Sequence, residues 1–585
     1  MSDLESVVPK HFGNLTAAEI KLLRNAGVGE LAVCGPNDNL NASINDPTTA
    51  QNWGTDRSIR GELIGWLCAN RMAKDLVDPG GIQVFGARII GVVKLLSVTI
   101  EFPLAFACCQ FCDEINLQSA RTRTLSFTQT HMQSILADGA VIGGAVFIRD
   151  SYAGLLQFPG VRIEGQFGCT DNTFDTLILD GGVVSVGVLL RGSKGRVKMT
   201  RARIGTDLDC QGALFSGVPG SSDPALDAGG ISVEGSVFLR AGFRAEGLVL
   251  LHGAQIGFNL DCVGGRFDTV QGNRTALNFD SSVVRGTAFL SDGFQAEGEV
   301  RLTSSQIEGD LSCAKAKFGS GLIAERSIVK GTLFWREIQN PETVSLNLLN
   351  TSVDSLSDDK ESWPCNGNLQ LHGFVYSVIS AFSQRDANSR LVWLSRLKLF
   401  TPQPYRQLAS VLKDEGDDVG ARQVLYKLAD IRAQKSTGRG AKLWSLILKS
   451  VVGYGYYPGL SLLWLAGLAL LGFALFWGGY CAGIMVPTDK DAYVSFRNDH
   501  RLPDYYERFH ALVYSAENSF PLVKFGQVDR WQPEPSSDGP AHQGVSRLEF
   551  FTVWLLRAFR WGQILLGWFF TTMGIAGVTG IVRRD

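Results

Sequence analysis

The sequence has almost no net charge, because its 55 lysines and arginines meet 57 aspartates and glutamates. A protein dedicated to nucleic acid or another polyanion carries an excess of positive charge, so the balance gives that class no support. Charged residues make up only 19% of the chain and hydrophobic residues 45%, which excludes disorder throughout. We therefore expect no nucleic acid among the partners.

Familiar catalytic motifs are missing. The chain has no GxSxG, Walker A or HExxH pattern, and its seven histidines lack the spacing of metal ligands. Gly27 to Ala32 fits the GxGxxG/A dinucleotide pattern, but it follows a helical run with a Thr16/Glu19 capping box. We interpret it as a helix C-cap. These observations predict no cofactor and no metal, and they lean away from an enzyme.

An apolar core is also missing from the first residues, MSDLESVVPKHFG, so we do not expect them to act as a secretory signal. The chain has 11 cysteines, and none follows Val486. Cysteines placed in this way suit a chain whose bulk stays in a reducing cytosol.

Two long uncharged runs lie near the C-terminus. Residues 450–488 contain no charged residue, and 561–582 form a second such run. Each is longer than the ~20 residues that cross a bilayer core. We predict a first transmembrane helix at 459–486, and a second with a cytoplasmic tail at 551–585.

Cationic residues predict the orientation of these spans. Lysines and arginines are frequent before the first run, and Arg583 and Arg584 follow the second. The positive-inside rule then places residues 487–550 in the periplasm. Residues 438–458, which include KLWSLILK, are expected to lie at the membrane interface. The predicted location is the bacterial inner membrane, with two spans, the lipid bilayer as a partner, and the bulk of the chain in the cytoplasm.

Repeats fill the first half of the chain. Four similar segments begin at Ile163, Ile204, Ile256 and Ile307, and residues 235–267 match 286–318 at an offset of 51. Short alternating apolar runs separated by turns are typical of many short strands, and a fixed period indicates a solenoid. We predict a mainly β fold: a right-handed parallel β-helix, pentapeptide-like, over 79–352, with its end and a connector at 353–400. Coils of roughly 20–25 residues would make the offset two turns plus a small insertion.

The repeat phase predicts which side chains point inward. Cysteines 169, 210, 262 and 313 occupy the same phase, so we expect them to stack as small apolar core residues. The alternative, a metal-binding thiolate ladder, is disfavoured because ligands two coils apart would be about 10 Å from each other. The Cys109/Cys112 pair has metal or redox spacing, and we expect it to be buried packing. Phe238, Phe289, Ile256 and Ile307 are also expected inside, and Glu308 outside.

Helices are expected on both sides of the solenoid. Residues 1–78 are predicted to form a helical N-terminal cap. Residues 401–437 are predicted to form a hairpin similar to a tetratricopeptide repeat (TPR-like), with helices at 404–416 and 418–434. A lone hairpin cannot build a groove for peptides, so we expect it to pack against the end of the β-helix.

Two residue sets are candidate contact sites. A basic stretch has partial period-two alternation, which indicates a solvated β-helix face or, alternatively, a dock for anionic lipid or phosphate. It consists of Arg191, Lys194, Arg196, Lys198, Arg201 and Arg203. Small residues of the second span could pack against the first span or another copy, which would make the protein a homo-oligomer. They are Gly574, Ala576, Gly577 and Gly580, and the spacing of Ala576 and Gly580 favours one shared face.

The chain resembles a family of large bacterial membrane proteins, some labelled membrane-associated oxidoreductase. The matching blocks include Ser362-WPCNGNLQLHGFVY, Arg390-LVWL, Pro402-QPYRQLA, Gly453-YGYYP and Phe520-PLVKFGQVDRW. The resemblance covers nearly all of the chain after residue 59 and implies an N-terminal β-helix with a two-helix membrane hairpin. The oxidoreductase label finds no cofactor motif in this sequence, and we discount it.

A looser resemblance links the chain to pentapeptide-repeat proteins with an ion-channel-like end. In such an arrangement, residues 510–527 would form a re-entrant segment between the spans. The filter-like Val452-Gly-Tyr-Gly455 precedes the first span, where a filter has no use, so we interpret it as a glycine turn.

Three functions follow from these patterns. The first is a membrane-anchored cytoplasmic β-helix scaffold or sensor, which binds a protein or envelope partner on its long face. The second is an oligomeric two-helix pore with a cytoplasmic β-helix domain. The third is a membrane-associated oxidoreductase.

Overall fold

The computed structural model describes residues 3–218, 221, 223–269, 274–499, 501–534 and 547–581. Arg583 and Arg584, on which part of the orientation prediction depends, lie outside this range. The chain divides into two compact units, Met1–Glu415 and Gly416–Asp585.

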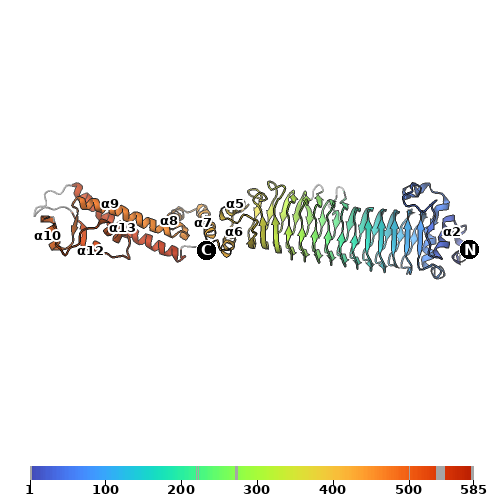
Figure 1. Cartoon of the computed structure of the whole chain (residues 1–585). Coiled ribbons are helices and arrows are strands. Elements are labelled where there is room, and N and C mark those ends of the chain that lie inside the picture. Colours follow the sequence, from blue (N-terminus) through green and yellow to red (C-terminus); the bar gives the residue numbers. More distant parts are fainter. Residues whose placement is uncertain are drawn as a thin grey trace. The chain divides into compact units, whose positions relative to one another are not determined.

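The first unit is dominated by a parallel β-solenoid of about 13 turns, whose strands stack one above the next (Figure 1). One ladder consists of β3 (Ile82–Phe85), β6 (Leu104–Ala107), β10 (Leu125–Thr128), β13 (Val146–Arg149), β16 (Phe167–Thr170), β19 (Val188–Leu189), β22 (Leu208–Asp209), β26 (Val237–Phe238), β30 (Leu260–Asp261), β34 (Ala288–Phe289), β38 (Leu311–Ser312), β41 (Ile328–Trp335), β43 (Ser352–Asp358) and β45 (Val375–Ile379). A second ladder of the same sheet consists of β9 (Arg121–Thr122), β12 (Val141–Ile142), β15 (Arg162–Ile163), β18 (Val183–Val184), β21 (Arg203–Ile204), β25 (Ser232–Val233), β29 (Gln255–Ile256), β33 (Val283–Val284) and β37 (Gln306–Ile307).

The other sheet closes each turn. One of its ladders consists of β4 (Arg88–Ile90), β7 (Gln110–Phe111), β11 (His131–Leu136), β14 (Tyr152–Gln157), β17 (Thr173–Ile178), β20 (Lys194–Lys198), β23 (Leu214–Ser216), β27 (Arg244–Glu246), β31 (Arg266–Asp268), β35 (Gln295–Ala296) and β39 (Lys317–Phe318). From β20 a further ladder continues through β24 (Leu226–Asp227), β28 (Val249–Leu250), β32 (Thr275–Asn278), β36 (Glu299–Arg301), β40 (Gly321–Ile323), β42 (Leu346–Asn347) and β44 (Leu369–Gln370).

Strand register fixes the length of each turn. Leu125, Val146, Phe167 and Val188 are partners in order, so these turns take 21 residues each. Val237 pairs with Leu260, which pairs with Ala288, giving turns of 23 and 28 residues. Together these two turns make up the 51-residue offset. The prediction of two turns plus a small insertion is confirmed.

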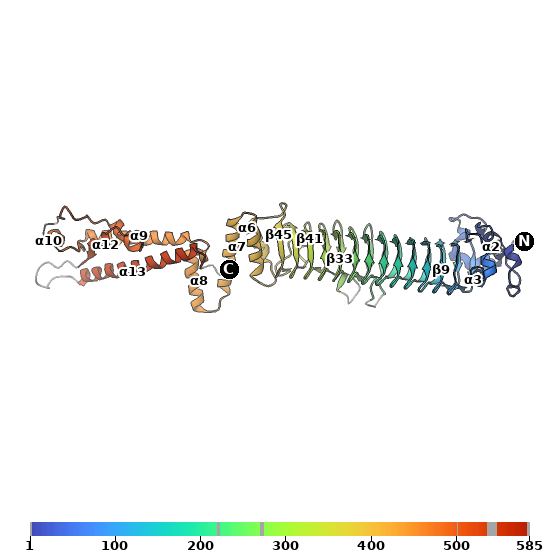
Figure 2. The same cartoon turned by 90° about the horizontal axis from the view of Figure 1, so that it is seen from below.

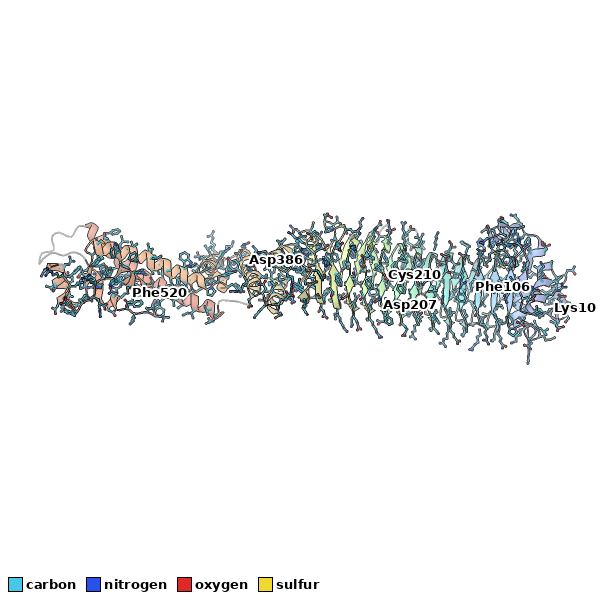
Figure 3. The ribbon with its side chains drawn as sticks, in the orientation of Figure 1. Lys10, Phe106, Asp207, Cys210, Asp386 and Phe520 are labelled. Atoms are coloured by element: carbon cyan, nitrogen blue, oxygen red, sulfur yellow. The ribbon has the colours of Figure 1, made fainter. Side chains whose placement is uncertain are left out.

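The repeated cysteines point into the solenoid. Cys169, Cys210, Cys262 and Cys313 have no exposed surface, as predicted (Figure 3 labels Cys210). Backbone hydrogen bonds align them with leucines of the intervening turns, so cysteine and leucine alternate along this column. Burial raises the pKa of the Cys169 thiol to about 12 against the effect of hydrogen bonds with Asn172 and Ser193, so it behaves as an apolar core group.

Aromatic rings form a second internal column. Phe215, Phe243, Phe267, Phe294, Phe318 and Trp335 follow one another, with ring centroids 5.1–5.6 Å apart. At these separations, neighbouring rings add to the burial of apolar surface. This column and the cysteine–leucine column fill the interior of the later turns.

The prediction that side chains point into the solenoid is wrong for two phenylalanines. Phe238 and Phe289 are half-buried and point away from the core, whereas their neighbours Val237 and Ala288 are fully buried. The outer face of Phe238 carries Arg240, whose guanidinium lies 4.6 Å from the ring centroid. The inward prediction is correct for Ile256 and Ile307, and Glu308 is exposed as expected.

Short helices precede the solenoid: α1 (Asp3–Ser6), α2 (Ala17–Ala26), α3 (Gly61–Ala69) and α4 (Arg71–Lys74). The capping box of Thr16 and Glu19 is present, and α2 ends one residue before Gly27, so the C-cap interpretation is confirmed. Glu19 is buried, and its carboxylate accepts hydrogen bonds from the guanidinium of Arg60 at 2.7 Å. This ion pair joins α2 to β2 (Ser58–Arg60), a strand of the solenoid.

Blocks that carry the family resemblance meet at the other end of the solenoid. Arg390, on α5 (Ala387–Ser395), forms two 2.7 Å hydrogen bonds with the Asp358 carboxylate, and both side chains are buried. The indole of Trp363 donates to the same carboxylate at 2.8 Å. Because burying a charge is unfavourable unless it is paired, this cluster depends on all of its members.

Helix α6 (Gln403–Asp414) covers the last strand, β45 (Figure 2). The side-chain amides of Gln403 and Gln407 donate to the carbonyls of Phe374 and Tyr376. These bonds replace partners that a further coil would have supplied, so the edge of the sheet is not left open.

The second unit is mainly helical. It contains α7 (Asp418–Lys435), α8 (Arg439–Val452), α9 (Gly459–Cys481), α10 (Lys490–Asp499), α11 (Ala511–Ser519), α12 (Gln527–Arg530) and α13 (Arg547–Val578), with an antiparallel pair of β46 (Met485–Pro487) and β47 (Trp531–Pro533). The filter-like Val452–Gly455 forms the turn between α8 and α9, as interpreted. Helices α6 and α7 have the predicted bounds within two residues. They belong to different units, so the TPR-like hairpin stays a prediction.

Candidate functional site

Helices α9 and α13 are long and apolar enough to cross a membrane. Only 33% of the most apolar window in α9, and 17% of that in α13, is buried within the protein. The core helix of a soluble protein would be mostly buried. Both helices instead present large apolar side chains outward, among them Leu463, Trp464, Leu565 and Trp568.

A third helix, α11, lies between these two. The hydroxyl of Ser515 donates to the carbonyl of Ala469 on α9 at 2.7 Å. The amide of Gln563 on α13 donates to Ser515 Oγ at 2.8 Å and to Ser519 Oγ at 2.7 Å. Ala469 is the eleventh of the 23 residues of α9, so α11 reaches the middle of that helix.

Two glycines make room for α11. A methyl group on Gly472 would collide with Ser515 Oγ and the amide of Gln563, and one on Gly567 would collide with the carbonyl oxygen of Ser519. Gly467 on α9 and Gly562 on α13 have open space around them. Close approach of α11 therefore depends on particular glycines, which fits the use of small residues where membrane helices meet.

After α11 the chain turns back on itself. Phe520 packs against an apolar cluster that includes Leu465 and Phe570 (Phe520 is labelled in Figure 3). The Glu517 carboxylate then accepts three backbone N–H groups, from Gly526 at 3.1 Å, Gln527 at 2.9 Å and Val528 at 3.0 Å. Residues 521–526, the return segment, therefore run back beside α11.

The start and the end of this path lie side by side. The side-chain carbonyl of Gln527 accepts the backbone N–H of His510 at 3.1 Å. Residues 510–527 thus enter between α9 and α13, turn and leave on the side where they entered. This is the path expected of a re-entrant segment.

The return segment is uncovered. Leu522 is 74% exposed and Phe525 58%, and Lys524 is also exposed. No described residue donates a hydrogen bond to the carbonyl oxygens of Leu522, Val523 or Lys524. The segment therefore offers a row of free acceptors shortly after Phe520, which packs against α9 and α13.

The residues that seat α11 are not among the candidates that the sequence patterns predict. Ser515, Ser519, Glu517 and Gln563 are all buried, with at most 9% of their surface exposed. Gln563 carried a usable signal, since it is a lone amide in the run Trp561-GQILLGW. A polar residue within an apolar span is expensive to bury in lipid and marks a functional position.

The predicted small-residue set is divided by the structure. A methyl group on Gly574 would collide with Ser461 Oγ, and one on Gly577 would lie 3.1 Å from Pro458, so both face the start of α9. Ala576 is half-buried. Gly580 follows the last residue of α13, with a φ of +79° and open space around it. It ends the helix, so the expected face shared by Ala576 and Gly580 is wrong.

The basic stretch does not form one face. Lys194, Arg196 and Lys198 lie on β20 of one sheet, whereas Arg203 lies on β21 of the other. Carboxylates neutralise three of its members, through the pairs Arg191–Asp209, Arg196–Asp223 and Lys198–Asp180. Lys194, Arg201 and Arg203 are exposed and form no ion pair with a described residue. This arrangement weakens the hypothesis that the basic stretch forms a single docking surface for anionic lipid or phosphate.

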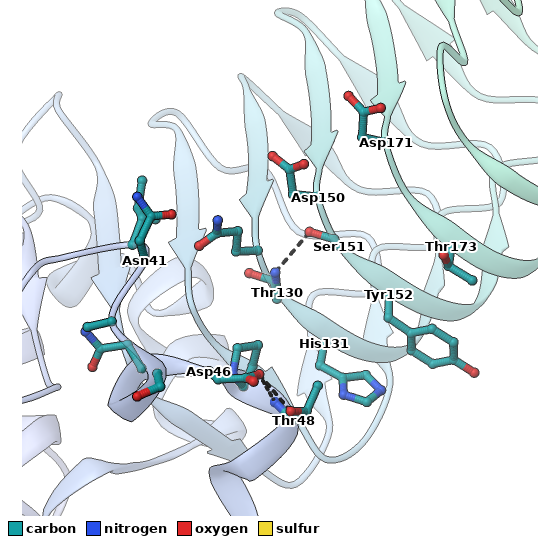
Figure 4. A pocket seen from close by; sticks show the side chains of 16 residues that line it. Asn41, Asp46, Thr48, Thr130, His131, Asp150, Ser151, Tyr152, Asp171 and Thr173 are labelled. Carbon is teal, nitrogen blue, oxygen red and sulfur yellow. Dashed lines mark hydrogen bonds between the residues drawn. The ribbon is translucent and has the colours of Figure 1, made fainter. Parts of the chain in front are cut away.

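A polar groove of about 670 Å³ lies on the early turns of the solenoid (Figure 4). Asp150 and Asp171 line it from successive turns, and His131 and Asp46 line it from below. Burial lowers the pKa of His131, which the charge of Asp46 partly offsets. Among the described residues, no three histidines, cysteines or carboxylates are close enough to hold a metal ion.

The two candidate sites differ in what they imply. The groove is an open polar surface whose described side chains do not converge as metal ligands. The segment around α11 is held by many hydrogen bonds, and it leaves the carbonyl oxygens of Leu522, Val523 and Lys524 without a described donor. Comparisons with protein-family models, with curated proteins and with solved structures find no match to the chain.

Proposed function

We propose that the protein is an oligomeric membrane pore, in which copies of residues 510–527 come together around a central pathway. α9 and α13 would span the bacterial inner membrane, with the solenoid as a cytoplasmic domain and residues 487–550 outside. The uncovered return segment carries this proposal.

Hydrogen bonding of the backbone supports this proposal. In lipid, a backbone carbonyl without a partner costs several kcal/mol, so irregular backbone occurs at membrane depth only where protein covers it or water reaches it. In a single copy, no described residue donates a hydrogen bond to the carbonyls of Leu522, Val523 and Lys524. Other copies that surround a water-filled pathway would supply both protein cover and water.

A simple anchor gives α11 no role. Two spans suffice to hold a solenoid at a membrane, and lipid-facing helices alone would do so without buried polar groups. Here Gln563 and Ser515 are buried between the spans, an expensive arrangement that suggests selection for something other than anchoring. The scaffold hypothesis explains the solenoid only, and nothing in the site favours the oxidoreductase.

The interfacial helix supports the placement of the unit. Leu443, Trp444 and Leu446 on α8 are all more than half exposed, and Lys442 lies beside them. An exposed apolar stripe next to basic residues is typical of a helix that lies at a membrane surface. The remaining predictions belong to this proposal too: a right-handed, pentapeptide-like solenoid, a helical cap at 1–78 and a TPR-like hairpin at 401–437.

The test uses full-length protein reconstituted into planar bilayers. We expect single-channel current from the natural protein and none from Gly472→Leu, because leucine there would displace α11. Gly467→Leu on the same helix is the matched control and should conduct, since it meets open space. Current that is equal in both variants would contradict the role of the re-entrant segment, and a strictly monomeric protein by native mass spectrometry would contradict the oligomer.

A further inference from the structure

We infer that the pore selects anions, and that Lys524 is the residue that selects them. This inference rests on the proposed function and names the class of ion that the same site would pass. It follows from the charges that the return segment leaves exposed.

Residues 511–527 contain only two charged side chains, Glu517 and Lys524. Glu517 is 9% exposed, and its two oxygens accept three backbone N–H groups. Hydrogen bonds of this kind compensate a carboxylate and leave it little field to offer a passing ion. Glu517 therefore holds the return segment in place and does not attract cations.

Lys524 is in the opposite situation. It lies on the uncovered stretch between Leu522 and Phe525, it is exposed, and no described carboxylate pairs with it. The positive charge at the exposed face of the return segment thus has no ion-pair partner in the part of the chain that the structure describes.

Two arginines of α13 also lack a carboxylate partner among the described residues. Arg557 and Arg560 donate to the backbone carbonyls of Pro533 and Val528. Glu507 is paired with Arg530 at 2.8 Å. The exposed Asp529 follows the return segment in the chain.

Assembly multiplies the effect. Each copy would contribute one Lys524, and a ring of ammonium groups around a narrow pathway attracts anions and repels cations. The free carbonyls of the same segment would favour cations in the absence of lysine. Lys524 therefore decides the sign of selectivity.

The experiment measures the reversal potential of the full-length protein in planar bilayers, with unequal KCl on the two sides. We expect the natural protein to prefer chloride. Lys524→Gln should lose that preference while current persists, and Lys524→Glu should convert it into a preference for potassium. Lys442→Gln, on the exposed face of α8, is the matched control and should prefer chloride as the natural protein does.

The outcomes separate the two proposals. Absence of current from the natural protein would overturn the pore, and the inference with it. Current that prefers potassium in the natural protein would overturn the inference and leave the pore standing, and so would an unchanged chloride preference in Lys524→Glu. If a variant fails to assemble, the reversal potential of the natural protein still shows whether the pore prefers anions.

Discussion

The two units of this chain place polar and apolar groups in opposite ways. In the solenoid, aromatic rings, leucines and cysteines fill the interior, and exposed charged side chains such as Glu308 lie on the outside. Between α9 and α13 the centre holds Ser515, Ser519 and Gln563, while leucines and tryptophans point out. The first arrangement suits a protein surrounded by water and the second suits helices surrounded by lipid.

The units also differ in how they satisfy the backbone. Inside the solenoid, nearly every strand has a parallel partner above and below. The second unit satisfies its backbone mainly within helices and in the β46–β47 pair, whereas the carbonyls of Leu522, Val523 and Lys524 accept no hydrogen bond from a described residue. The predictions that follow probe each side of this contrast.

The largest effect is expected at the end of the solenoid. Arg390→Met should leave the buried Asp358 without its partner and destabilise the first unit by about 3–5 kcal/mol. Thermal unfolding of full-length protein, followed by far-ultraviolet circular dichroism, would measure the loss. The double variant Arg390→Met/Asp358→Leu should recover part of it, and failure of the second change to help would mean that the charge is not the cause.

The next effect tests the inward phase. Ile307→Ala should remove a buried side chain and destabilise the solenoid by roughly 2–5 kcal/mol. Its exposed neighbour provides the control, since Glu308→Ala should change stability by less than about 0.5 kcal/mol. Phe289→Ala should fall between the two, because the ring is half-buried. Equal melting of the Ile307 and Glu308 variants would show that the assigned phase is wrong.

A smaller effect is expected for the polar centre of the second unit. Gln563→Leu removes hydrogen bonds to Ser515 and Ser519, and such bonds between membrane helices contribute about 0.6–2 kcal/mol each. Unfolding of the second unit by increasing fractions of SDS would report the change. Thr572→Val, at an exposed position of the same helix, should have no measurable effect. An increase in stability on Gln563→Leu would indicate that the amide serves conduction at the expense of packing.

The smallest effect concerns thiols and leaves stability untouched. Cys365 and Cys481 are exposed and should react first with a thiol reagent in the native state. Burial raises the pKa of Cys169, Cys262 and Cys313, so these thiols should react only after unfolding. Mass spectrometry of the alkylated protein would identify the labelled positions. Early labelling of the solenoid column would mean that its turns open readily.

Local patterns predicted much of this fold. The 51-residue offset indicated two turns, and the common phase of the cysteines placed them inside. The error at Phe238 and Phe289 has a local cause. Val237, Phe238 and Leu239 are consecutive apolar residues, and an alternation of two leaves either the middle residue or its neighbours inside. The structure places the valine and the leucine inside.

The seat of α11 could not be predicted in the same way. Ser515 meets Ala469 and Gln563, which are 46 and 48 residues away in the chain. No local periodicity relates positions so far apart. The re-entrant segment at 510–527 stays a prediction. The close approach of α11 depends on Gly472 and Gly567, and glycine is common enough in membrane helices that neither stands out in the sequence.

The alternation of cysteine and leucine along the solenoid makes the true structural unit a pair of turns. Each turn adds ~4.8 Å along the axis, so a pair adds about 10 Å. Between Cys169 and Cys313, removal or duplication of a whole pair would keep cysteine next to leucine, whereas a change by one turn would bring cysteine against cysteine or leucine against leucine. The length of the solenoid can therefore change by two turns at a time without a redesign of its core.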